Sequence, residues 1–113
     1  MSRYTAVELN AAQKEEMFRA AYRQLVMCIR LNNPEDMRER FLDSTFAFHM
    51  MKAEGRKNTS PLTQPHNRWI ENHQDQLNQA HIDFRAWLRL MLALEGEQDV
   101  VDRSIQYLDP EVN

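Results

Sequence analysis

Residues suited to a buried helix face recur every three or four positions between Ile70 and Leu94, with no glycine or proline among them. This spacing aligns them along one stripe of an α-helix, which would extend roughly 40 Å at about 1.5 Å per residue. A stripe of that length must pack against elements of similar length, so the pattern predicts an all-helical bundle. Its positions are Ile70, His73, Leu77, Ala80, Phe84, Trp87, Met91 and Leu94.

The residues before this stretch have the pattern of two more helices. Thr5 and Glu8 have the spacing of a capping box, in which two side chains bond the backbone amides of a first helical turn, and helical periodicity then continues to about residue 31. The segment 32–34, Asn-Asn-Pro, is expected to end this helix and to begin a second one. Gly55 suits the left-handed conformation that commonly ends a helix.

The second predicted helix, from about residue 35 to residue 54, has two apolar faces. Phe41 and Phe48 belong to one face, and Leu42, Phe46 and Met50 belong to the other. A helix that is apolar on more than one side is typically buried on more than one side. We therefore expect this helix to be central in the bundle.

The remaining segments complete the expected fold. Residues 56–64 are polar and proline-containing, which is typical of an exposed loop, and Pro65 or a neighbour is expected to open the long helix. Gly96 ends that helix, and residues 98–108 have the pattern of a short fourth one. Because the loops are short enough to join antiparallel neighbours, we expect one domain over residues 1–113. Its predicted fold is all-α, a small antiparallel helical bundle of three long helices plus a short C-terminal helix.

The composition indicates a cytoplasmic protein that has no membrane segment. The chain has 113 residues, of which 42% are hydrophobic, and no apolar run approaches the roughly 18 residues that span a bilayer. The first ten residues lack the apolar stretch of a signal peptide. A single cysteine cannot form an intramolecular disulfide, which agrees with a reducing compartment.

The charge distribution argues against a general nucleic-acid binder. Residues 1–57 carry 10 basic and 8 acidic side chains, a net charge of +2, whereas residues 58–113 carry 4 basic and 9 acidic ones, a net charge of −5. Nucleic-acid binding relies on clustered Lys and Arg, and no dense cluster is present. The alternative function is nevertheless a DNA-binding transcriptional regulator with a helix-turn-helix variant, in which Arg38, Arg40 and the Arg56-Lys57 pair contact phosphates.

The sequence predicts no enzymatic activity, no cofactor and no metal site. Both glycines are expected at helix ends, so no glycine-rich loop remains to hold a phosphate. The four histidines, at positions 49, 66, 73 and 81, lack the Glu-x-x-His segments of a di-iron bundle. Cys28 shares a face with Leu25 and Ala21, which favours a buried structural thiol over a nucleophile.

No segment of the sequence resembles a motif specific to a known family. We therefore expect a non-enzymatic protein-binding module, which would be a small cytoplasmic regulator, inhibitor or chaperone-like adaptor. Aromatic and Arg side chains are enriched at binding hot spots, so the predicted contact surface for a protein partner comprises Arg56, Arg68, Trp69 and Ile70. Trp69 is expected to lie partly in water at the edge of the stripe. The competing interpretation is that Trp69 closes the end of the core.

The first half of the long helix also predicts self-association. From Glu71 to Asp83 only a narrow stripe of the helix is apolar, and the rest of its surface is polar. The core of one small bundle does not need the whole length of that stripe. A two-fold interface is the commonest way to cover such a stripe with a second copy. The chain is therefore expected to be a homodimer that pairs through His73, Leu77 and Ala80.

Overall fold

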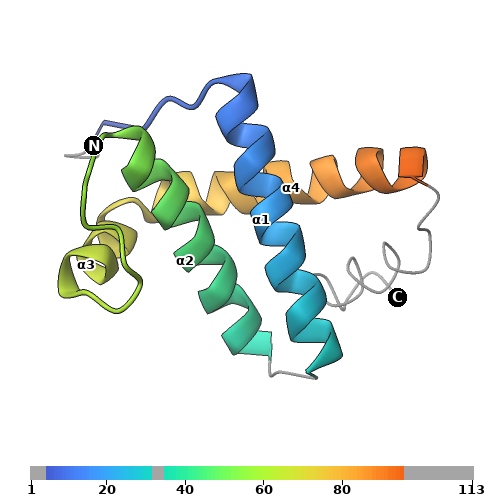
Figure 1. Cartoon of the computed structure of the whole chain (residues 1–113), viewed down its shortest axis with the longest axis horizontal. Coiled ribbons are helices and arrows are strands. Elements are labelled where there is room, and N and C mark those ends of the chain that lie inside the picture. Colours follow the sequence, from blue (N-terminus) through green and yellow to red (C-terminus); the bar gives the residue numbers. More distant parts are fainter. Residues whose placement is uncertain (1–4, 32–34, 96–113) are drawn as a thin grey trace.

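The computed structural model describes residues 5–31 and 35–95, and these two ranges contain four helices and no strand. The helices are α1 (Ala11–Arg30), α2 (Glu35–Ala53), α3 (Gln64–Asn72) and α4 (Gln74–Glu95). α1 and α2 run antiparallel beside each other, α4 crosses behind both, and the short α3 lies at one side of α2 (Figure 1). The predicted all-α helical bundle is thus confirmed. The short helix predicted at 98–108 lies outside the described residues.

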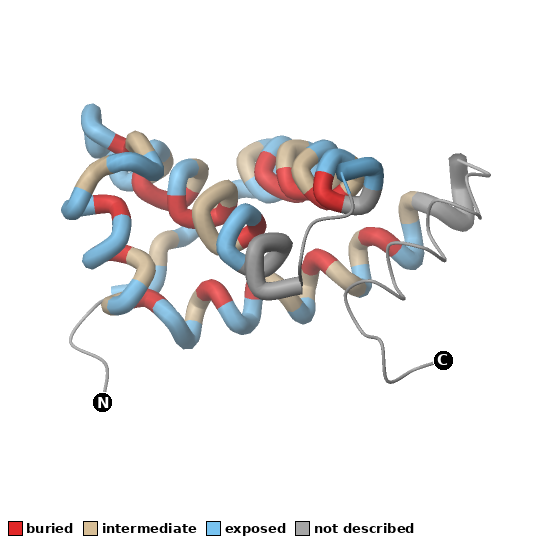
Figure 2. Tube along the Cα trace, turned by 90° about the horizontal axis from the view of Figure 1, so that it is seen from below, coloured by how far each residue is buried: buried red, intermediate tan, exposed pale blue. Residues whose placement is uncertain are grey.

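The core lies where α1, α2 and α4 meet, and its centre is a cluster of aromatic rings. The centroid of the Phe84 ring lies 5.8 Å from that of Phe18, 5.9 Å from that of Phe46 and 6.0 Å from that of Trp87. Phe18, Phe46 and Phe84 are buried, whereas Trp87 is half-buried. Figure 2 shows buried positions recurring along every helix, as expected where each helix turns one face inward.

The long helix predicted from residue 65 to residue 94 is divided at His73, so the prediction of one continuous rod is wrong. His73 has a φ of −120° and a ψ of 28°, which lie outside the helical range, and it separates α3 from α4. Its backbone N–H still bonds the carbonyl oxygens of Trp69 and Ile70, at 3.0 and 3.3 Å. Its imidazole Nδ1–H donates to the Trp69 oxygen at 2.9 Å. The Trp69 carbonyl oxygen at the end of α3 therefore accepts two hydrogen bonds from His73, one from its backbone and one from its side chain.

The break also changes which residues face the core. Trp69 is buried and Ile70 is only half-buried, although the stripe predicted the reverse. An indole ring removes more apolar surface from water than an isoleucine side chain does, so the orientation that buries Trp69 gains more free energy.

The first helix begins five residues later than Thr5–Glu8 predicted. Its capping box is formed by Asn10 and Gln13, since the Gln13 N–H donates to Asn10 Oδ1 at 2.8 Å and the Asn10 N–H donates to Gln13 Oε1 at 3.0 Å. Residues 5–10 are not helical. Instead, Val7 exchanges two hydrogen bonds with the side-chain amide of Gln76, at 3.0 and 2.7 Å, which attaches this segment to α4.

No helix within the described ranges combines the length and the apolar character needed to cross a bilayer.

Candidate functional site

Two hollows lie on different faces of α3. We call the first the α3 pocket; it has a volume of about 270 Å³ and is lined by Arg56, Gln64, Pro65, Arg68, Trp69, Asn72 and His73. We call the second the α2 groove; it has two sections, of about 510 and 640 Å³, which share Phe41, Ser44 and Pro61. The other residues that line the groove are Ala20, Gln24, Arg40, Thr45, Phe48, His49, Leu62, Asn67, Ile70 and Glu71.

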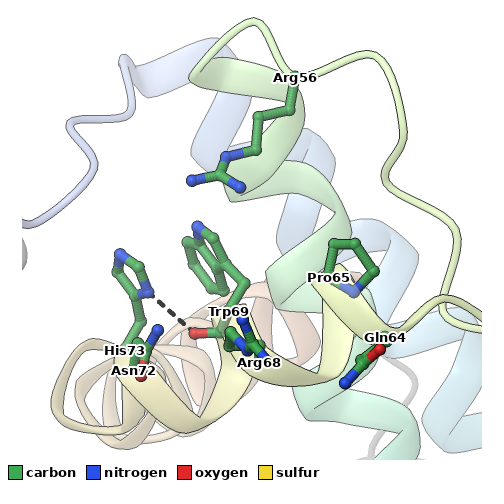
Figure 3. A pocket seen from close by; sticks show the side chains of 7 residues that line it. All are labelled: Arg56, Gln64, Pro65, Arg68, Trp69, Asn72 and His73. Atoms are coloured by element: carbon green, nitrogen blue, oxygen red, sulfur yellow. Dashed lines mark hydrogen bonds between the residues drawn. The ribbon is translucent and has the colours of Figure 1, made fainter.

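The turn after α2 positions Arg56 at the rim of the α3 pocket. Gly55 has a φ of 83°, and the N–H of Arg56 bonds the Met51 oxygen at 3.1 Å while the N–H of Gly55 bonds the Lys52 oxygen at 2.9 Å. This pair of bonds around a left-handed glycine is the Schellman arrangement that ends a helix. The cap predicted at Gly55 is therefore confirmed, and it directs the Arg56 side chain toward Trp69 (Figure 3).

The wall of the α3 pocket is a stack of two rings held by a carboxylate. The rings of Trp69 and His73 are nearly parallel, with centroids 3.9 Å apart and an interplanar angle of 8°. Glu54 Oε2 accepts hydrogen bonds from Trp69 Nε1 at 3.1 Å and from Arg56 Nε at 2.9 Å. These contacts fix the indole in one orientation. With only 2% of its surface exposed, Trp69 closes the end of the core, and the prediction that its ring lies partly in water is wrong.

The four residues predicted to contact a partner are divided between the two hollows. Arg56, Arg68 and Trp69 line the α3 pocket together. Ile70 lines the α2 groove, because one further residue along a helix rotates the side chain by about 100°. The sequence analysis thus grouped three residues that are neighbours in the structure, Arg56, Arg68 and Trp69. It placed Ile70 with them only because Ile70 follows Trp69 in the chain.

The residues predicted for self-association lie inside the single chain. His73 is 8% exposed, Leu77 is 0% exposed and Ala80 is 5% exposed, so all three are buried. The narrow stripe is covered by the chain's own helices, and it offers no surface to a second copy in this conformation. These three residues therefore give no support for a dimer. The oligomeric state itself stays a prediction, which light scattering tests.

The α2 groove contains the exposed aromatic residues that the sequence interpretation missed. Phe41 and Phe48 are each 38% exposed, whereas Leu42 and Phe46 on the inward face of α2 are fully buried. Beside them Leu62 is 92% exposed in the loop that follows α2. The second apolar face of α2 is thus only partly covered, because Met51 on this face is buried whereas Phe41 and Phe48 are partly exposed, and the prediction that both faces are buried holds only in part.

A buried histidine joins the loop to α2 between the two hollows. His66 Nδ1–H donates to the Thr59 carbonyl oxygen at 3.0 Å, and the Ser44 hydroxyl donates to His66 Nε2 at 3.2 Å. The ring is fully buried. Burial disfavours the charged imidazolium and lowers the pKa of His66 below 6.5, although the hydrogen bond to Thr59 opposes this shift.

The lowered pKa of His66 predicts a loss of stability in mild acid. The unfolded chain binds a proton at this position below about pH 6.5 more readily than the folded chain does, so the free energy of unfolding falls as pH falls through that range. Urea denaturation between pH 7 and roughly pH 5 measures this slope. The His66→Gln variant is expected to show a shallower slope, and equal slopes in the two proteins would contradict the assignment. Part of the slope should persist, because burial also lowers the pKa of His49.

Within residues 5–31 and 35–95, no three His, Cys, Asp or Glu side chains are close enough together to share a metal ion. Cys28 is buried. Among the described basic residues of the DNA-binding alternative, Arg40 lines the α2 groove, Arg56 lines the α3 pocket and Lys57 lines neither hollow.

No family model matches the chain, and neither the curated proteins nor the solved structures contain a detectable relative.

Proposed function

We propose that the protein is a non-enzymatic protein-binding module, a small regulator, inhibitor or adaptor, and that it binds its partner in the α2 groove. The observation that carries this proposal is the exposure of Phe41 and Phe48 on one continuous hollow with Leu62. Exposed apolar surface that gathers in one place, rather than being scattered singly, is typical of interaction sites. Aromatic side chains are also the ones enriched at the centre of interfaces.

The lining of the groove favours a macromolecular partner over a small molecule. Phe41 and Phe48 lie seven residues apart, so their Cα atoms span about 10 Å along α2, or two helical turns. Polar side chains such as Gln24, Arg40 and Glu71 belong to the same hollow. An apolar centre with polar surroundings is the usual composition of a protein interface.

The occupant we propose is the apolar face of a helix from a different protein. Two aromatic residues one heptad apart match the i, i+3, i+4 and i+7 anchors that such a helix presents to a groove. The oppositely charged Arg40 and Glu71 near one end would fix the direction of the bound helix through charge complementarity.

Comparative affinity purification tests the proposal. The purified chain, the Phe41→Ser/Phe48→Ser double variant and a control variant, Leu90→Ser, are each used as bait in extracts of the native host. Leu90 is 69% exposed on α4 and lines neither hollow. We expect one defined protein to be retained by the wild type and by the control and to be lost at least tenfold from the double variant, since hot-spot truncations cost about 2 kcal/mol or more.

Two results would overturn the proposal. The first is that the double variant, with an unchanged melting temperature, retains the same protein as the wild type does. The other is that the groove occupant is a second copy of the chain, seen as a doubled mass by light scattering in the wild type alone. Chromatography on heparin at low salt tests the DNA-binding alternative. We expect that the column does not retain the protein, because its described basic residues are dispersed.

A further inference from the structure

We infer that the α3 pocket binds a carboxylate group of an acidic peptide segment. This inference deepens the proposed function, because it rests on the partner being a protein and assigns the chemistry of a second contact with it. The α2 groove and the α3 pocket lie on different faces of α3, so the two contacts involve different side chains.

Apart from His73, the polar side chains that line the pocket carry hydrogen-bond donors, and the two carboxamides among them also carry acceptor oxygens. These side chains comprise the guanidinium groups of Arg56 and Arg68 and the carboxamides of Gln64 and Asn72, and no Asp or Glu lines the hollow. Gln64, Arg68 and Asn72 are spaced four residues apart, which places them along one face of α3. The Arg56 side chain comes from the turn after α2 and lies over the Trp69 ring (Figure 3). Guanidinium groups form short, charge-assisted and often bidentate hydrogen bonds with carboxylates.

The two guanidinium groups have capacity for such bonds. Arg68 is exposed, and it makes no hydrogen bond or ion pair with other residues in the described part of the chain. Arg56 donates from Nε to Glu54, and its terminal nitrogens lie over the pocket (Figure 3). Glu54 offsets one of the two positive charges, and its Oε2 atom also accepts from Trp69 Nε1. The lining of the pocket therefore keeps an excess of positive charge.

The size of the pocket limits what can enter. A volume of about 270 Å³ corresponds to about nine waters at roughly 30 Å³ each, which is room for one residue with a carboxylate. It lies just below the range of about 300 to 1,000 Å³ that holds drug-sized ligands. The Schellman turn fixes the backbone of Arg56 and the stacked rings fix Trp69, so the ordering required on binding is mainly that of the Arg56 and Arg68 side chains.

The two tryptophans allow a direct test by NMR. The indole N–H of Trp69 belongs to the wall of the pocket, whereas the indole N–H of Trp87 donates to Glu15 at 2.8 Å on α1 and serves as an internal control. A six-residue glutamate peptide with an amidated C-terminus is titrated into the ¹⁵N-labelled full-length chain at low salt. We expect a saturable shift of the Trp69 indole signal, an unchanged Trp87 signal, and weaker binding as salt screens the charges.

Variants and further peptides define the contact. Arg68→Gln and Arg56→Gln are each expected to weaken binding about tenfold or more, and the control Arg89→Gln, an exposed residue of α4 outside both hollows, is expected to leave it unchanged. A six-alanine peptide with a free C-terminus tests a main-chain carboxylate as the source. Saturable binding of the glutamate peptide supports the inference, whereas binding of the alanine peptide alone would contradict an acidic segment as the ligand. A six-glutamine amidated peptide is the neutral control, and equal binding of it would overturn the inference.

Failure of this inference is distinguishable from failure of the proposed function. Absence of any peptide-dependent shift, or an identical shift with inorganic phosphate alone, would overturn the carboxylate site while partner capture through the α2 groove could still stand. The Phe41→Ser/Phe48→Ser variant is expected to keep the full peptide affinity, because neither residue lines the α3 pocket. Loss of peptide binding in that folded variant would contradict the assignment.

Discussion

Replacing Phe84 with alanine is expected to lower the free energy of unfolding by about 3 to 5 kcal/mol, the range seen when a buried aromatic side chain is truncated. Phe84 is fully buried, and its ring contacts Phe18 on α1 and Phe46 on α2. Its removal leaves a cavity at the point where three helices meet. Chemical denaturation followed by far-ultraviolet circular dichroism measures the change.

Two matched controls accompany the Phe84 measurement. Trp87→Ala is expected to cost less than Phe84→Ala although the side chain is larger, because Trp87 is only half-buried at the edge of the ring cluster. Leu90→Ala is expected to change stability by about 0.5 kcal/mol or less, as surface substitutions usually do. A cost for Phe84→Ala as small as that of Leu90→Ala would contradict the position of the core.

The second large effect is expected at Trp69. Trp69→Ala should also cost about 3 to 5 kcal/mol, because the indole is buried, stacks on His73 and donates to Glu54. Trp69→Phe should cost clearly less, since it keeps an aromatic ring against His73 and loses the hydrogen bond to Glu54 and part of the buried volume. Thermal and urea unfolding of the two variants measure these costs.

The Trp69 variants also separate a structural role from a binding role. The account predicts that the affinity for the partner bound in the α2 groove, expressed per folded molecule, is unchanged in Trp69→Phe. A stable Trp69→Ala protein that no longer binds that partner would instead make Trp69 the central contact residue.

The helices were predictable because their signals are local. Apolar spacing, the Asn-Asn-Pro segment before α2 and Gly55 after it each act within a few residues of the backbone they shape. The division between α3 and α4 was not predictable in the same way. No proline or glycine marks it, and His73 ends α3 through a side-chain bond to a carbonyl that only the folded backbone brings into reach.

The start of α1 depended on a competition between two similar signals. Thr5–Glu8 and Asn10–Gln13 have the same spacing, and asparagine is the better N-cap residue of the two. The deciding contact is the pair of hydrogen bonds between Val7 and Gln76, which are 69 residues apart in the chain. Because these two residues are so far apart in the chain, no periodic pattern of the sequence indicates that they are in contact.

The candidate site could be predicted only in part for a related reason. Arg56, Arg68 and Trp69 were identified by residue type, and the fold brings them to one pocket. Phe41 and Phe48 were expected to be buried, because residue spacing shows which side chains share a face but not whether another element covers it. The helices that bury Leu42 and Phe46 leave Phe41 and Phe48 partly exposed, and this outcome depends on how α1 and α4 pack against α2 (Figure 1).

Site-specific photo-crosslinking in the native host tests whether the α2 groove binds a different protein. A photoreactive phenylalanine analogue replaces Phe48 in the α2 groove in one protein and Leu90 on the exposed face of α4 in another. The account predicts that the first protein forms a covalent adduct with the same partner that affinity purification identifies, and that the second does not. Equal adducts at the two positions, or an adduct at position 48 made only with a second copy of the chain, would contradict the assignment of the α2 groove as the site that binds a different protein.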